Sequence, residues 1–105
     1  MLEQVFNYST GDHKVIEKLI MDENVNYIHM VFNKGEGLPE HFSNSTVYMN
    51  VIRGTLSLML GEQEEVKYDK GSLLKIPNKI KMNVRNKNDD TLELIVIKAP
   101  APDYK

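Results

Sequence analysis

The chain has 105 residues, of which 41% are hydrophobic and 27% are charged, and its formal net charge at pH 7 is −2. This length fits one domain, and the weakly acidic balance argues against a protein whose main partner is a nucleic acid. Cysteine is absent, so disulfide bonds and thiolate chemistry are excluded. No apolar run approaches the ~20 residues that span a bilayer, and no signal peptide is visible. We therefore expect a cytoplasmic protein.

The first predicted elements are short strands separated by polar turns. Residues 4–8 form the first strand-like run, and residues 9–12 end it. The run 13–21 is ambiguous, because its apolar residues also fit helical spacing. A turn-like segment at 22–24 leads from it into the strand-like run 25–32. Since strands flank the ambiguous run on both sides, we predict a strand there too.

Five further strand-like runs follow, at residues 45–52, 55–60, 65–68, 79–87 and 92–97. The run 79–87 alternates most regularly, with its cations on one face and Ile80, Met82, Val84 and Asn86 on the other. The period of two places the second set inside and the cations in solvent. Short strands at regular spacing, without a convincing helix, predict an all-β jelly roll or a similar barrel.

Residues 35–54 contain a set of fixed intervals. Five residues separate Gly35 from His41-Phe42-Ser43, three more precede Val47, and six more precede Gly54. Glycines between strand-like runs suit turns that need a positive φ.

A second set of intervals follows at residues 71–86. Five residues separate Gly71 from Pro77, and the tripeptide Pro77-Asn78-Lys79 is followed by Met82 after two residues and by Asn86 after three more. The two sets of spacings together resemble the paired motifs of the cupin family.

The resemblance covers residues 25–97 and implies the fold of that family. The expected fold class is all-β, with the double-stranded β-helix or jelly-roll barrel of the RmlC-like superfamily. Residues 1–105 then form a single cupin domain, in which 25–97 is the barrel core. Residues 4–21 supply N-terminal strands, and residues 98–105 form an extended C-terminal tail.

In metal-binding cupins the two motifs hold the ion with three His and one Glu. This chain has His41, Ser43, Val47 and Met82 at those positions, so only His41 matches a family ligand. A divalent first-row metal takes about three or four N, O or S ligands. We therefore predict a degenerate metal site and no cofactor. His29 is a second weak metal candidate if its strand face points into the barrel, and otherwise an exposed or hydrogen-bonded surface residue.

A barrel of this kind still offers a pocket at its mouth, with apolar walls and a few polar groups. The candidate ligand-binding residues are His41, Ser43, Val47, Met49, Met82 and Asn86. For the aliphatic members, the alternative is simple core packing. These residues favour a small-molecule-binding or regulatory barrel.

Two alternatives to a binding barrel remain open. One is a cupin-type isomerase, dioxygenase or decarboxylase that uses His41 as ligand or general base. The other is an interaction protein. The expected partner is an unknown small molecule, with no nucleic acid and no membrane. The resemblance also implies a homodimer, for which residues 4–8 and 92–97 are candidate contact segments.

Overall fold

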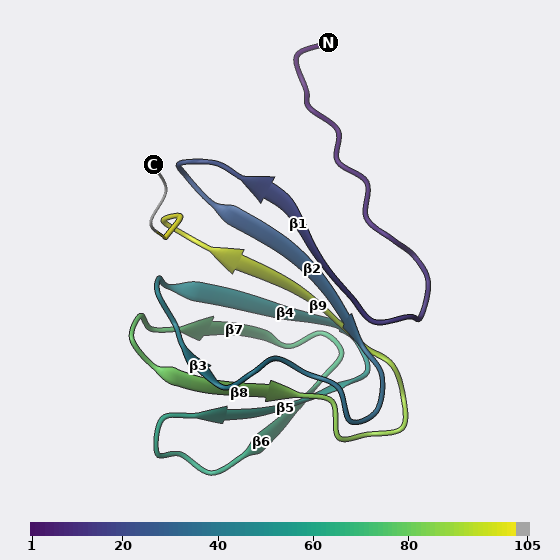
Figure 1. The fold of residues 1–105 in the computed structure, drawn as a ribbon, viewed down its shortest axis with the longest axis vertical. Coiled ribbons are helices and arrows are strands. Elements are labelled where there is room, and N and C mark those ends of the chain that lie inside the picture. Colours follow the sequence, from purple (N-terminus) through teal and green to yellow (C-terminus); the bar gives the residue numbers. More distant parts are fainter. Residues whose placement is uncertain (103–105) are drawn as a thin grey trace.

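The computed structural model describes residues 1–102, in which nine strands and no helix occur. The strands lie in two antiparallel sheets that face one another (Figure 1). Their bounds are β1 Val15–Met21, β2 Asn26–Phe32, β3 His41–Phe42, β4 Val47–Arg53, β5 Thr55–Leu60, β6 Val66–Asp69, β7 Leu73–Ile76, β8 Lys81–Arg85 and β9 Leu92–Lys98.

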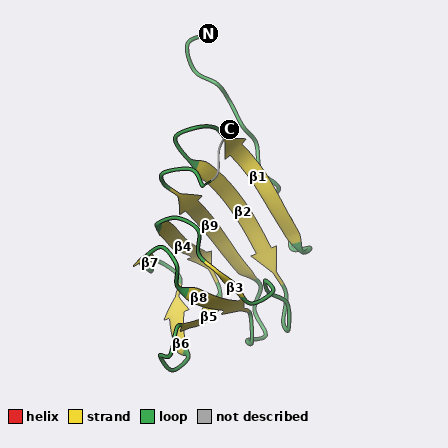
Figure 2. Ribbon diagram, turned by 60° about the vertical axis from the view of Figure 1, so that its left-hand side comes forward, coloured by secondary structure: helices red, strands yellow, loops and turns green. Residues whose placement is uncertain are grey.

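The two sheets have different sizes and a crossed connectivity. The larger has the order β1-β2-β9-β4-β7, and the smaller has the order β3-β8-β5-β6 (Figure 2). The chain therefore passes repeatedly from one sheet to the other, as in a jelly roll. The expected all-β fold class is confirmed, and β9 lies in the middle of the larger sheet.

Alternation along the strands decides which side chains form the core. In β4, Val47, Met49 and Val51 are buried while the residues between them are not. The inward faces of β2, β5, β8 and β9 contribute further buried residues: Ile28, Met30, Phe32, Leu56, Leu58, Met82, Val84, Leu92, Leu94 and Val96. Burial of these faces between the two sheets is the main source of stability.

The register of the larger sheet places side chains in rows across its inner face. Lys18 pairs with Ile28, Ile28 pairs with Val96, and Val96 pairs with Met49. In the adjacent row, Lys98 pairs with Asn26 on one side and with Val47 on the other. Because paired residues point to the same face of a sheet, both lysines belong to the inner face.

Gly54 shows why the first motif ends in glycine. It connects β4 to β5 with a φ of +80°. A Cβ atom there would lie 2.3 Å from the carbonyl oxygen of Thr91. The turn therefore needs both the positive φ and the missing side chain.

Several sequence predictions need correction. Residues 4–8 form no strand, because no neighbouring strand pairs with them, and they are exposed. Strands β3 and β7 were not predicted. The ambiguous run 13–21 does contain a strand, β1, with a register shift between Lys18 and Ile20. In the predicted tail, residue 98 ends β9, and residues 103–105 lie outside the described part of the chain.

Two substitutions test which side chains of β8 point into the core, one at a buried position and one at a position on the outer face. Val84 is fully buried, whereas its neighbour Asn83 is on the opposite face. Val84→Asp buries an unpaired charge and is expected to lower the free energy of unfolding by about 3–5 kcal/mol. Asn83→Asp is the matched control and should change it by no more than about 0.5 kcal/mol. Urea unfolding measures both free energies. Similar decreases in the two variants would contradict the assignment of Val84 to the buried face and Asn83 to the outer face.

Candidate functional site

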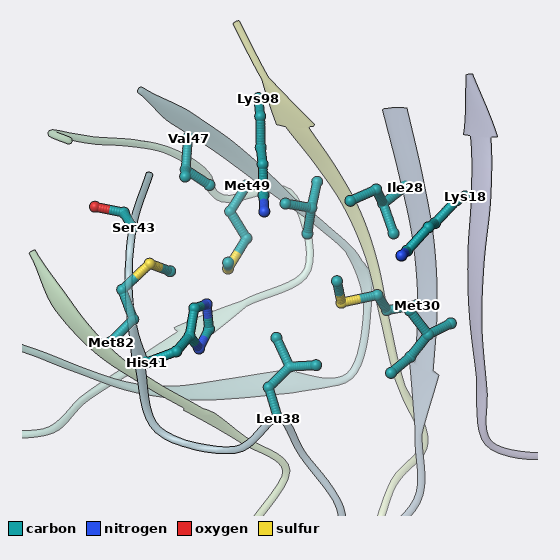
Figure 3. Close-up of a pocket in the computed structure, with 12 residues that line it drawn as sticks. Lys18, Ile28, Met30, Leu38, His41, Ser43, Val47, Met49, Met82 and Lys98 are labelled. Atoms are coloured by element: carbon teal, nitrogen blue, oxygen red, sulfur yellow. The ribbon is translucent and has the colours of Figure 1, made fainter. Parts of the chain in front are cut away.

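A cavity of about 190 Å³ lies between the two sheets (Figure 3). Its wall on the larger sheet comes from β1, β2, β9 and β4, and its wall on the smaller sheet comes from β3 and β8. The lining residues are Ile16, Lys18, Ile28, Met30, Leu38, His41, Ser43, Val47, Met49, Met82, Val96 and Lys98. Most are apolar, so the few polar groups stand out.

Two lysines contribute positive charge to this apolar cavity. Lys18 comes from β1 and Lys98 from the last position of β9. Their amino groups both point toward the cavity (Figure 3). Within residues 1–102, neither is paired with a carboxylate.

Burial lowers the pKa of Lys98 below its usual value, and the positive charge of Lys18 lowers it further. Both causes act in the same direction, because burial removes water from the charged amine and Lys18 repels it. An anion bound in the cavity would oppose both effects, because a nearby negative charge favours the charged amine.

His41 is the aromatic polar group of the cavity. It belongs to the two-residue strand β3 and pairs with Met82 of β8. Its Nδ1 lies 2.8 Å from the carbonyl oxygen of Pro39, so Nδ1 carries the hydrogen and donates. In the neutral ring, Nε2 then has a free lone pair. The ring faces the cavity from the side opposite the two lysines (Figure 3).

Of the other predicted pocket residues, three line the cavity with apolar side chains and one, Ser43, has a structural role. Val47, Met49 and Met82 line the cavity with apolar surface. Ser43 also borders it, but its hydroxyl donates to the carbonyl of Pro77 at 2.8 Å and accepts from the amide of Ile80 at 2.9 Å. The hydroxyl holds β3 against the turn before β8 and points away from the cavity (Figure 3).

Asn86 is not a pocket residue, contrary to the sequence prediction. It is fully buried, as its strand face requires, but it does not line the cavity. Its side-chain amide donates to the carbonyls of Phe32 and Asp90, and its oxygen accepts from the amide of Asn88. With these groups satisfied, its role is to fix the loop between β8 and β9.

His29 lies on the outer face of the larger sheet and does not approach His41. The core is formed instead by the opposite face of β2. His29 is nonetheless 0% exposed. Its Nδ1 lies 2.7 Å from Glu17 and its Nε2 lies 2.6 Å from Glu93. An ionised carboxylate can only accept a hydrogen bond, so each of the two ring nitrogens would have to donate one. A neutral imidazole has a single N–H, so the two hydrogen bonds together need one further proton.

The N-terminal segment covers this histidine. The ring of Tyr8 lies 4.7 Å from that of His29, and the amide of Ser9 donates to Glu17 at 3.0 Å. Arg53, which also bonds Glu93, donates to Asp12 and to the carbonyl of Gly11. We call Glu17, His29, Glu93 and Arg53 the outer cluster. The alternation of β2 alone did not predict it, because its partners are distant in sequence.

The cavity residues do not fit the metal that the cupin motifs imply. Of the four family ligand positions, Val47 has no donor atom, Ser43 has its hydroxyl engaged, and Met82 offers a thioether. Only His41 supplies a nitrogen ligand, whereas divalent first-row metals take about three or four ligands. No group of three or more His, Cys, Asp or Glu suited to a metal occurs in residues 1–102. The two cavity lysines add charge that repels a cation.

The outer cluster predicts an acid-sensitive attachment of the N-terminal segment. The hydrogen bond from His29 lowers the pKa of Glu17 below 4.5, and the Ser9 amide lowers it further. A lowered carboxyl pKa stabilises the attached state above pH 4.5, and this stabilisation is lost as the pH falls through the lowered pKa. In NMR spectra, Tyr8 should therefore keep its folded shifts above pH 4.5 and approach random-coil shifts in stronger acid.

Two variants test the origin of this pH response. Glu17→Gln should detach Tyr8 at neutral pH and remove the dependence. Asp22→Asn is the control, because Asp22 has its pKa lowered by the amides of Val25 and Asn24 instead. If Tyr8 responds identically in wild type and Glu17→Gln, the outer cluster does not hold the segment.

Comparison with known proteins places the fold in a family. No family model matches the chain. The chain is 40% identical, over 103 residues, to an uncharacterized protein of Methanocaldococcus jannaschii, MJ0764, and the match covers 97% of this chain and 89% of the relative. The crystal structure of MJ0764, described as an RmlC-like cupin family protein with a double-stranded β-helix fold, superposes with a TM-score of 0.94 and covers 97% and 94% of the two chains.

More distant structures share the fold alone. A cupin superfamily protein of Desulfitobacterium hafniense has a TM-score of 0.75 at 12% identity and covers 89% of this chain and 83% of its own. The protein TT1209 of Thermus thermophilus has a TM-score of 0.75 at 20% identity and covers 91% of both. No helix in residues 1–102 is long and apolar enough to cross a membrane. The sequence match and the close structural match show that the chain belongs to the RmlC-like cupin family.

Proposed function

We propose that the cavity binds a small, mainly apolar molecule that carries a carboxylate or a similar anionic group, without the help of a metal. The observation that carries this proposal is the presence of Lys18 and Lys98 at one apolar cavity, with no described carboxylate paired to either. Apolar walls with a few convergent polar groups are typical of small-molecule sites.

Charge complementarity supports an anion rather than a neutral ligand. A partly buried ammonium group loses part of its hydration, and a bonded opposite charge offsets that loss. The lowered pKa of Lys98, caused by burial and by Lys18, supports this proposal, because it indicates that the charged amine has no offsetting partner among the described residues. An anion between the two amines would be such a partner.

The size of the cavity limits the ligand. A volume of about 190 Å³ is below the roughly 300–1,000 Å³ of drug-sized sites and comparable to the ~150 Å³ apolar cavity that holds benzene. A single ring or a short aliphatic chain fits this volume. The thioethers of Met30, Met49 and Met82 adapt to several apolar shapes.

His41 supplies the polar group on the opposite wall. Its free Nε2 accepts a hydrogen bond from a hydroxyl or amide on the ligand. The alternative proposal, an enzyme that uses His41 as general base, needs the same nitrogen beside a substrate proton. The binding proposal additionally accounts for both lysines, so we favour it.

Hexanoate and hexanamide form a matched ligand pair that tests the anionic requirement. Isothermal titration calorimetry is expected to show binding of hexanoate at least tenfold tighter than binding of hexanamide, which has a similar size and no charge. Lys18→Met should weaken hexanoate binding by roughly tenfold to a hundredfold, as expected for one lost charge-assisted hydrogen bond of about 1.5–3 kcal/mol.

Lys70→Met is the matched control, because Lys70, like Lys18, is an exposed lysine, but it lies on the turn between β6 and β7 and does not line the cavity. It should leave hexanoate affinity unchanged. Equal affinity for acid and amide, or equal effects of the Lys18 and Lys70 substitutions, would contradict an anion site in the cavity.

We also propose a second copy of the chain as partner and the cytoplasm as location. Absence of cysteine supports the latter. The predicted contact at 92–97 has no free edge, because β9 is flanked by β2 and β4. Residues 1–7 instead extend from the sheets (Figure 1) and expose Met1, Leu2, Val5 and Phe6. Such apolar side chains favour contact with a partner.

Light scattering tests this partner proposal. The full chain should have twice the monomer mass at micromolar concentration, and deletion of residues 1–7 should leave a monomer while keeping the Tyr8 contact. A full chain of monomer mass, or a dimer that survives the deletion, would overturn this arrangement.

A further inference from the structure

We propose that Lys98 is a nucleophilic amine, which forms an imine with the carbonyl carbon of a small oxo acid held in the cavity. The inference rests on the proposed anion-binding function and goes beyond it, because it assigns covalent chemistry to one lysine and narrows the ligand class to carbonyl-bearing carboxylates.

The position of Lys98 directs its amine inward. It continues the inward row of β9 after Leu92, Leu94 and Val96. It lies between Asn26 and Val47 on the two flanking strands, both of which are buried. In Figure 3 its nitrogen points into the cavity, toward the side where His41 and Met49 lie. A ligand in the cavity therefore meets the amine directly.

The surroundings also favour the reactive form. A lysine attacks a carbonyl only as the neutral amine, and a desolvated lysine beside another cation reaches that form at lower pH. Burial lowers the pKa of Lys98, and the charge of Lys18 lowers it further. Among described residues, the other ionisable groups that line the cavity are Lys18 and His41. Neither supplies a negative charge.

The step balances without an added oxidant or reductant. The lone pair of Lys98 Nζ forms a C–N bond to the carbonyl carbon, and the carbonyl π electrons move to oxygen, which takes up a proton. The amine loses a proton, and the carbinolamine then loses its C–O bond as water leaves. One amine and one carbonyl compound give one imine and one water.

The remaining polar groups have complementary roles. Lys18 holds the carboxylate of the oxo acid by a charge-assisted hydrogen bond, which keeps the carbonyl carbon near Lys98. His41 lies on the opposite wall, and its Nε2 takes up the proton that the attacking amine loses and passes it to the departing oxygen. The cavity thus offers a binding cation, an amine nucleophile and a proton donor.

Reductive trapping with 2-oxohexanoate tests the inference on the full-length protein. Incubation with the oxo acid and sodium cyanoborohydride should convert the imine into a stable secondary amine. Intact-mass spectrometry is expected to show one adduct per chain, and peptide mapping should place it on Lys98. Exposed Lys70 reports the background rate, and Lys98 should react at least tenfold faster at pH 7.

Two substitutions test the amine of Lys98 and the carboxylate contact of Lys18 separately. Lys98→Arg keeps the cation and forms no imine, so it should abolish the adduct while retaining hexanoate binding within about tenfold. Lys18→Met should slow the trapping of 2-oxohexanoate more than that of hexanal, which has no carboxylate to hold. Circular dichroism and urea unfolding confirm that each variant is folded.

The outcomes distinguish this inference from the proposed function. Hexanoate binding without a Lys98 adduct overturns the imine and leaves the anion site intact. An adduct on Lys18, or adducts spread evenly over surface lysines, also overturns it. Absence of both hexanoate binding and adduct contradicts the anion site and the imine together.

Discussion

Face-to-face packing of two sheets is the constraint on which both functional regions depend. Because strand side chains alternate, every strand of the larger sheet sends one row toward the smaller sheet and one row outward. The inward side chains form the apolar core, and Lys18 and Lys98, which also face inward, line the cavity at the border of that core. The outward row carries His29, whose polar surroundings come from the neighbouring strands and the N-terminal segment. One register thus determines a cavity on one face and a charged cluster on the other.

The two regions differ in how their charged side chains are paired. In the outer cluster, His29 and Arg53 each have carboxylate partners, and the cluster is closed by hydrogen bonds. In the cavity, the described residues place Lys98 beside another cation, and its pKa falls as a result of burial and that charge. A carboxylate partner satisfies the charge and the hydrogen bonds of a cation, whereas an unpaired cation at a cavity can bind an anionic ligand. This contrast is the physical reason for assigning binding to the cavity and an attachment role to the outer cluster.

The barrel and most of the apolar residues on its inner face were predictable from the sequence. The two lysines of the cavity were not. The spacing from Gly35 to Gly54 and the alternation around Met82 are local signals, so they identified the fold and the core face. Lys18 and Lys98 each resemble a solvated strand residue, and only the register through β2 brings them to one cavity. Residues 4–8 have strand-like composition, yet pairing needs a neighbour that local pattern does not supply.

The most direct test of an anion site in the cavity is an NMR titration of the lysine side chains with and without hexanoate. A desolvated Lys98 beside Lys18 is expected to titrate, in the free protein, below its usual value of 10.5 and below exposed Lys70. Bound hexanoate should raise the pKa of Lys98, because a paired anion favours the charged amine. If the pKa of free Lys98 is 10.5 or higher and does not change on adding hexanoate, the amine is not desolvated and does not bind the anion. That result would contradict the proposed anion site.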